Sequence, residues 1–215
     1  MPYRKVPLVN GGIYHVFTRS IAGYKIFTCD REYERMTDTI AFYSTENAPC
    51  RFSFFEKAGK DARLRADHTG KIVRIISYCL MPTHIHLVLQ QLQDGGITKF
   101  ANQILKSHSK YFNVKYKRKG PLWEGRFKSV AVDKDEYLLH LTRYIHLNPV
   151  TACFVNKPEE WPYSSFMEYL TTSNKRGICD YNDILDIKAK AYRDFVEDRI
   201  DYQRKLSLLK KLWLE

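Results

Sequence analysis

The stretch IVRIISYCLMPTHIHLVLQQ, residues 72–91, decides the fold expected of this 215-residue chain. It contains two runs rich in β-branched and aliphatic residues, 72–80 and 84–91, separated by Met-Pro-Thr. Two such runs joined by a few turn-forming residues are typical of adjacent antiparallel strands. The sequence therefore predicts a β-hairpin in the middle of the chain.

The second strand of this hairpin carries two histidines, His84 and His86. Because side chains alternate across a strand, these imidazoles project from one face while Ile85, Leu87 and Leu89 project from the other. Neutral imidazole is the commonest protein ligand for metal ions, and two histidines at i and i+2 can share one ion. Two half-exposed histidines on a polar sheet face would give the same pattern, so the spacing alone leaves both interpretations open.

Outward from the hairpin, strand patterns and helix patterns alternate unevenly. Residues 13–18, 51–56 and 127–132 are rich in β-branched and aromatic residues and are predicted to be strands. Apolar spacing predicts helices over 30–43 and 97–116 and partly over 161–170 and 184–213, while the polar segment 57–71 is expected to be a surface excursion. This order favours an α+β fold with helices on one face of an antiparallel sheet.

A further helix is predicted from Asp133 or Asp135 through Tyr144. It is expected to end near Asn148, because Pro149 disfavours α geometry in the residue before it. Tyr144 and Asn148 are four residues apart and would share one face, where a phenol can attack a phosphodiester and an amide oxygen can bind a metal. The chain has 15 tyrosines, however, and the residues alone do not select this one.

The net charge of +11 indicates a polyanionic partner such as a nucleic acid or an anionic surface. Residues 106–128 carry eight Lys or Arg against one acid, Glu124, and residues 1–25 carry four with no acid, so these two stretches hold the whole excess. Tyr, Phe and Trp lie among the basic residues and could stack on bases. A solvated basic loop would show the same composition.

The cysteine pattern and the hydropathy indicate the cellular compartment in which the protein is expected. The five cysteines are widely separated and form no C-x-x-C pair, which argues against a disulfide framework or a structural zinc site. The most apolar region, residues 72–89, is interrupted by Arg, Pro and His, which argues against a membrane span. We therefore expect a reduced, soluble, cytoplasmic protein that does not bind membranes.

Four segments, in this order, resemble a known family: GGIYHVFTR, SYCLMPTHIHLVL, KYFNVKYKRKGPLWEGRFKSVAVDKDEYLLHLTRYIHLNPV and EEWPYSSFMEYL. They are similar to the single-tyrosine HUH transposases, particularly the REP-associated tyrosine transposase branch of the IS200-like transposases. The resemblance implies a ferredoxin-like or palm-like antiparallel sheet with helices packed on one face. It also implies that His84 and His86 bind a divalent cation, that Tyr144 is the nucleophile and that Asn148 is the third ligand.

The activity implied by the resemblance is that of a metal-dependent single-stranded DNA endonuclease and strand transferase, a transposase acting on hairpin-forming repeat DNA. Mg²⁺ or Mn²⁺ would be the cofactor, and a 5′-phosphotyrosine linkage the intermediate. Residues 1–170 would form the catalytic domain and 171–215 a helical C-terminal extension. The residues expected to bind DNA are Lys115, Lys117, Arg118, Lys119, Arg126 and Lys128, with Trp123 as a stacking candidate beside Tyr116 and Phe127.

Two other functions are compatible with the sequence. A domesticated DNA- or RNA-binding protein on the same fold would bind without cleaving, and the charge distribution supports it equally well. A relative of replication initiators or relaxases would share the chemistry but act at plasmid or phage origins, and the compact length and the Y-I-x-x-N-P motif argue against it. Both monomers and homodimers are compatible with the sequence, so the tyrosine could act in its own protomer or across an interface.

Overall fold

The computed structural model describes residues 6–46, 51–59, 70–171 and 177–205. Within these residues the strands are β1 (Ile13–Arg19), β2 (Val73–Met81), β3 (His84–Gln91) and β4 (Lys128–Val132). The helices are α1 (Asp30–Tyr43), α2 (Phe52–Lys57), α3 (Gly96–Lys115), α4 (Asp135–Thr151), α5 (Phe166–Leu170) and α6 (Ala189–Glu197), with short 3-10 turns η1 (Ile21–Gly23) and η3 (Pro158–Glu160).

The strands form one antiparallel sheet in the order β2-β3-β1-β4. Together with α1 and α3 they follow the chain order β1-α1-β2-β3-α3-β4, which is the ferredoxin-like arrangement. The predicted hairpin is present, since Met81 of β2 pairs with His84 of β3 across a two-residue turn. The α+β class expected from the sequence is confirmed.

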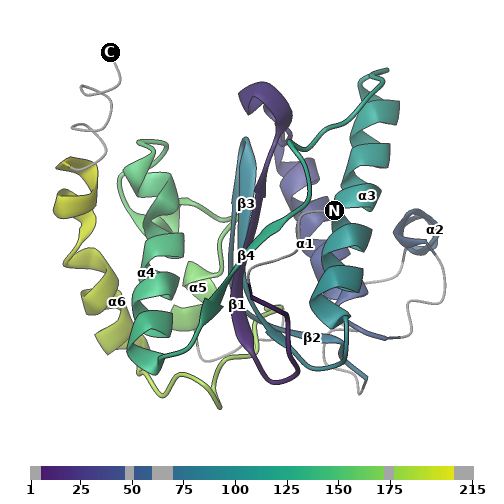
Figure 1. Cartoon of the computed structure of the whole chain (residues 1–215). Helices are drawn as coiled ribbons and strands as arrows, with labels where there is room; N and C mark the ends of the chain where they lie inside the picture. The colour runs from purple at the N-terminus through teal and green to yellow at the C-terminus, as the bar shows by residue number, and fades with distance from the viewer. Residues whose placement is uncertain (1–5, 47–50, 60–69, 172–176, 206–215) are drawn as a thin grey trace.

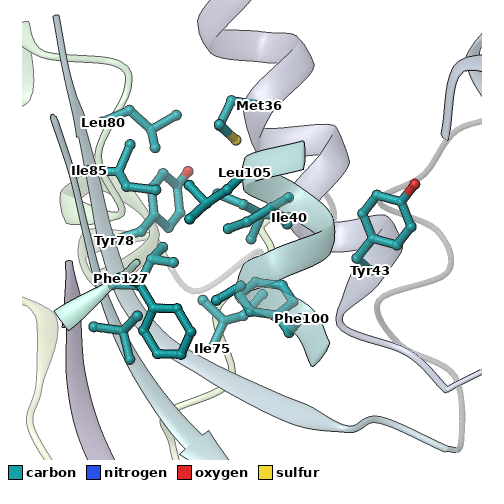
Figure 2. Packing of buried hydrophobic residues seen from close by; sticks show 14 of the residues in the cluster. Met36, Ile40, Tyr43, Ile75, Tyr78, Leu80, Ile85, Phe100, Leu105 and Phe127 are labelled. Atoms are coloured by element: carbon teal, nitrogen blue, oxygen red, sulfur yellow. The ribbon is translucent and has the colours of Figure 1, made fainter. Parts of the chain in front are cut away.

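One face of the sheet is covered by α1 and α3. Ile85, Leu87 and Leu89, the alternate residues of β3, are each at most 2% exposed and belong to this apolar core. Figure 2 shows the packing: side chains of the sheet meet those of the two helices, and the labelled residues include Met36, Ile40, Ile75, Leu80, Ile85, Phe100 and Leu105. Periods of two in the strand and about 3.6 in the helices align these apolar positions.

The opposite face is covered by α4 and α5, and α6 packs against these two helices farther from the sheet (Figure 1). Val88 of β3, Cys79 of β2, Ile145 of α4 and Tyr192 of α6 are all fully buried in this second core. The expectation of helices on one face therefore holds only for α1 and α3 and is otherwise wrong. The reason is that this face of β2 is also apolar, as is Val88 of β3, and exposing these residues to water would cost free energy.

Two local predictions are also wrong. The expected strand over residues 51–56 is instead occupied by helix α2 (Phe52–Lys57), because Phe52 and Phe55, three residues apart, pack against Phe42, while Phe54 remains 61% exposed. Helix α4 does not end near Asn148 but continues to Thr151 with Pro149 inside it. Burial of Pro149 and Val150 in the second core outweighs the local preference of the residue before a proline.

Some expectations fall outside the described residues. These concern most of the polar segment 57–71, Arg4 and Lys5 of the basic N-terminal stretch, and residues 172–176 and 206–215 of the C-terminal extension. The described part of that extension joins the second core through α6, and its division from residues 1–170 stays a prediction. No helix within the described ranges is long and apolar enough to cross a membrane.

Candidate functional site

A pocket of about 570 Å³ opens between the sheet and α4. It brings together four residues that the sequence nominated, His84 and His86 from β3 and Tyr144 and Asn148 from α4. The other lining residues are His15, Phe17, Thr18, Arg19, Ser20, Gly23, Thr83, Glu124 and Val130. Because β3 alternates, its histidines reach the pocket while Ile85 between them is buried on the far side of the sheet.

Both histidines use their Nδ1 atoms in hydrogen bonds. His84 Nδ1 lies 3.0 Å from Thr83 Oγ1, and His86 Nδ1 lies 2.9 Å from His15 Nε2. Among the described residues, no hydrogen bond uses the Nε2 atom of either His84 or His86. A metal-binding imidazole characteristically has its second nitrogen hydrogen-bonded in this way, which fixes the orientation of the ring.

The pocket histidines are neutral at physiological pH. Burial lowers the pKa of His84 to about 4, and the nearby charge of Arg19 lowers it further. Burial also lowers the pKa of His86 to about 2, with contributions from His15, His84 and Arg19. A neutral imidazole has a free lone pair, so both side chains can bind a cation without first losing a proton.

Tyr144 and Asn148 lie one turn apart on α4, as predicted. Tyr144 is 45% exposed, and its ring meets those of His86 and His15 edge-on, with centroids 6.0 Å and 6.5 Å away. The amide nitrogen of Asn148 is buried and has no hydrogen-bond partner among the residues that the structure describes. The unpartnered N–H group can donate to an acceptor such as a phosphate oxygen, whereas a cation would bind the amide oxygen of the same side chain.

The position of α4 is fixed by contacts on its buried side. His146 is fully buried, and its ring nitrogens lie 2.6 Å from the Tyr192 hydroxyl of α6 and 2.7 Å from Ser165 Oγ. The guanidinium of Arg143 stacks on the ring of Phe195 at 4.0 Å. The C-terminal helix thus holds the tyrosine helix against its own sheet.

The donor set restricts which metal site is possible. Within the described residues, no group of three or more His, Cys, Asp or Glu side chains could hold a metal ion. A cation in this pocket would therefore depend on the amide oxygen of Asn148 in addition to His84 and His86. Two imidazoles and one amide form a neutral set that leaves coordination positions for water or phosphate oxygens, so the residues fit a divalent cation that binds its substrate.

The residues expected to bind DNA do not line the pocket, and three of them are engaged elsewhere. Trp123 is 9% exposed and donates its indole N–H to Ser109 Oγ at 2.9 Å, so it is a core residue and its assignment as a stacking residue is wrong. Arg118 donates hydrogen bonds to the carbonyls of Gly120 and Pro121 and stiffens its own loop. Trp123 therefore packs inward, whereas Arg118 is held by its own exposed loop and its contact with DNA stays a prediction.

Lys115 pairs with a buried carboxylate, since its Nζ lies 2.7 Å from Glu32 Oε1. Burial raises the pKa of Glu32, but hydrogen bonds from Lys115, Tyr116 and Thr28 outweigh that effect and hold the net pKa below its usual value. The same hydrogen bond raises the pKa of Lys115. Lys115 therefore serves the fold by neutralising a buried charge.

The remaining basic candidates are exposed and are Lys117, Lys119, Arg126 and Lys128. Lys128 begins β4 and pairs with Phe17, a pocket residue of β1. Sequence reasoning missed His15, Phe17 and Arg19, which share the pocket face of β1. Their alternation within the segment GGIYHVFTR is a usable signal, but only the pairing of β1 with β3 shows that they reach His86 and His84.

Comparisons with known proteins agree with this geometry. Residues 64–148 match the family model described as "Transposase IS200 like". A putative REP-associated tyrosine transposase of Haemophilus influenzae is 32% identical over an alignment of 103 residues that covers 42% of this chain. The match spans 57% of the length of that curated relative.

A solved structure has the same fold. It is described as a REP-associated tyrosine transposase bound to a REP hairpin, and it aligns with a TM-score of 0.53 over 88% of this chain and 96% of its own, at 18% identity. The matched family segment contains all four nominated pocket residues. Residues 64–148 thus match the IS200-like transposase family, and the resemblance to the REP-associated tyrosine transposases that the sequence predicted is confirmed.

Proposed function

We propose that this protein is a metal-dependent single-stranded DNA endonuclease and strand transferase that cleaves hairpin-forming repeat DNA through Tyr144. The observation that carries the proposal is the convergence of His84, His86, Tyr144 and Asn148 on one pocket of an IS200-like domain. The phenol is exposed to the pocket, as a nucleophile must be to reach a phosphodiester. The solved relative bound to a REP hairpin supports DNA hairpins as the substrate.

His84, His86 and Asn148 would hold Mg²⁺ or Mn²⁺. When bound, the cation would supply positive charge to a phosphate oxygen and offset the charge that develops in the transition state. Thr83 and His15 orient the two imidazoles. Burial keeps both rings neutral, so the site is ready to bind a cation at physiological pH.

Tyr144 would attack the scissile phosphorus with its phenol oxygen. The new bond joins that oxygen to phosphorus and the bond from phosphorus to the 3′ oxygen breaks. The phenol proton passes to solvent, and the departing 3′ oxygen takes a proton from solvent. The products are a 5′-phosphotyrosine linkage and a free 3′-hydroxyl, which in the reverse direction can rejoin DNA without a further energy source. The pocket takes Tyr144 and both histidines from one chain, which supports action in cis.

The exposed basic residues Lys117, Lys119, Arg126 and Lys128 would contact DNA phosphates. Lys128 is the best placed of these, since it lies beside Phe17 at the edge of the pocket. Arg19 adds a further exposed cation to the pocket wall, 3.8 Å from Glu124.

Covalent adduct formation tests the proposal. Purified protein is mixed with Mn²⁺ and labelled single-stranded hairpin oligonucleotides from the DNA flanking its gene, and products are separated on a denaturing gel. We expect a covalent protein–DNA adduct that disappears in Tyr144→Phe while DNA affinity changes only a few-fold. Tyr137→Phe is the matched control, because Tyr137 lies on the same helix and is 44% exposed, and it should keep the adduct.

Two results would contradict this function. An adduct that persists in Tyr144→Phe would show that another residue is the nucleophile. Salt-sensitive binding of the same oligonucleotides without any adduct would favour the non-cleaving nucleic-acid-binding protein, which shares the fold and the exposed basic residues.

A further inference from the structure

We propose that His15 is a positioning residue that holds the ring of His86 with its Nδ1 protonated and its Nε2 bare toward the pocket. This role rests on the proposed function, because it matters only if His86 binds a cation. Nothing in the family match assigns it, since His15 lies outside the matched residues 64–148.

The contact between the two histidines is fixed by the sheet. His15 Nε2 lies 2.9 Å from His86 Nδ1, and both side chains are 8% exposed. His15 stands opposite Val88 in the pairing of β1 with β3, while His86 stands opposite Phe17, so the contact crosses the two strands diagonally. Because β1 and β3 are hydrogen-bonded neighbours, the ladder holds the backbone positions of the two histidines at a fixed separation.

Phe17 restricts the rings further. Its centroid lies 4.8 Å from that of His15 and 5.9 Å from that of His86, and the His15 and His86 rings are stacked at 20° with centroids 5.1 Å apart. Three flat groups packed this closely leave little room for rotation of His86 about its χ2 angle. The hydrogen bond is therefore a built feature of the pocket.

The hydrogen bond couples the two tautomers. A bond between two neutral imidazole nitrogens needs one that carries a proton and one that does not. If His86 Nδ1 donates to His15 Nε2, the Nε2 of His86 is bare and can bind a cation. In the opposite arrangement His86 Nε2 carries the proton and cannot bind a cation. A hydrogen-bond acceptor at position 15 therefore favours the His86 tautomer that can bind a cation.

The tautomer can be measured in the metal-free protein. Long-range ¹H–¹⁵N spectra of protein labelled with ¹⁵N-histidine distinguish the protonated nitrogen of each ring, and the His86 signals are assigned by their absence in His86→Ala. We expect a protonated Nδ1 for His86 in the wild type and in His15→Gln, whose amide oxygen can accept the same hydrogen bond. In His15→Phe the proton should move largely to Nε2. An Nε2-protonated His86 in the wild type would overturn the role of His15.

Mn²⁺ affinity gives the second measurement, read from the electron paramagnetic resonance signal of the free ion. Loss of a hydrogen bond that orients a metal ligand lowers metal affinity by about 10- to 100-fold. We expect a loss of that size in His15→Phe and affinity within a few-fold of wild type in His15→Gln. His140→Gln, an exposed histidine on α4 outside the pocket, is the control and should bind as wild type does.

The outcomes separate this inference from the proposed function. If His86→Ala abolishes Mn²⁺ binding and His15→Phe binds as tightly as the wild type, the role of His15 is wrong while the metal site stands. If His15→Gln is as weak as His15→Phe, His15 acts through ring packing and the inference is overturned. If the folded wild type binds no Mn²⁺, the metal part of the proposed function fails together with this inference.

Discussion

The two faces of β3 differ in environment, since residues that alternate along the strand face a buried core on one side and a pocket on the other. Ile85, Leu87 and Leu89 lie in a dry core against α1 and α3, each at most 2% exposed. His84 and His86 lie on the side of α4 and line an open pocket. Stability and chemistry are thus assigned to alternate positions of the same strand, so each can be changed while the other is largely preserved.

The side facing α4 is itself divided. On the β2 side of the sheet Cys79 and Met81 are fully buried in the second core, although they pair with His86 and His84, while on the β1 side Arg19 and the two histidines meet the pocket. The buried contacts fix α4, and with it the distance between the phenol and the histidines. A site of this kind needs a rigid helix because its two halves come from different elements.

The largest expected effects come from substituting each face of β3 in turn, because one face should affect cleavage and the other stability. The double variant His84→Ala and His86→Ala should lose metal-dependent cleavage entirely, since it removes two of three proposed ligands. Leu87→Ala, next to His86 along β3 but on the opposite face, should cost about 2–5 kcal/mol of unfolding free energy by cavity formation and retain cleavage per folded molecule. Cleavage assays and urea unfolding of the same preparations measure both effects.

Undiminished metal-dependent cleavage in the double variant would remove the histidines from the mechanism. Loss of cleavage in folded Leu87→Ala would show that the two faces are not independent. Either result would break the separation of stability from chemistry that the alternation of β3 suggests.

A histidine on the dry side provides the next test. His108 of α3 is fully buried, with Nε2 2.9 Å from the carbonyl oxygen of Ile26. Burial lowers its pKa from 6.5 to about 4, although the hydrogen bond to Ile26 acts in the other direction. Between about pH 6.5 and pH 4, His108 is therefore protonated in the unfolded chain but neutral in the folded one. The free energy of unfolding falls as the pH falls through this window.

We expect His108→Gln to reduce this loss. One such group contributes a slope of about 1.4 kcal/mol per pH unit, and the variant should lose stability less steeply than the wild type by that amount between about pH 6 and pH 4.5. Urea unfolding at several pH values measures the slopes. Mn²⁺ affinity should not change, because His108 lies outside the pocket. Parallel pH profiles of the two proteins would contradict the assignment.

The sequence predicts local features of this molecule better than long-range ones. Alternation over residues 84–91 suffices to separate the histidines from the core, because a strand has a strict period of two. Alternation could not place His15 beside His86, because that contact joins positions 71 residues apart and depends on the pairing of β1 with β3. The role of Tyr144 likewise came from family resemblance, since any of 15 tyrosines could have been chosen from chemistry alone.

The wrong predictions share a physical origin. Residues 51–56 are too short for their aromatic pattern to distinguish a strand from a helix, and contact with Phe42 decides between them. Pro149 continues in the helix because tertiary burial outweighs a local preference. Trp123 was judged by its basic neighbours, whereas its own ring is large and apolar and packs inward.

The smallest expected effect concerns Lys128, which stands at the rim between the pocket and the sheet edge. Lys128→Gln should leave stability within about 0.5 kcal/mol, because the side chain is exposed. Its loss should weaken binding of single-stranded DNA a few-fold and lower the slope of log affinity against log salt by about 0.7, the value for one phosphate contact. Lys190→Gln, exposed on α6 away from the pocket, is the control and should change neither quantity. Equal salt slopes for Lys128→Gln and the wild type would show that Lys128 does not contact the DNA. Because Lys128 is the exposed basic candidate paired directly with a pocket residue, the DNA strand would then have to leave the pocket over Arg19.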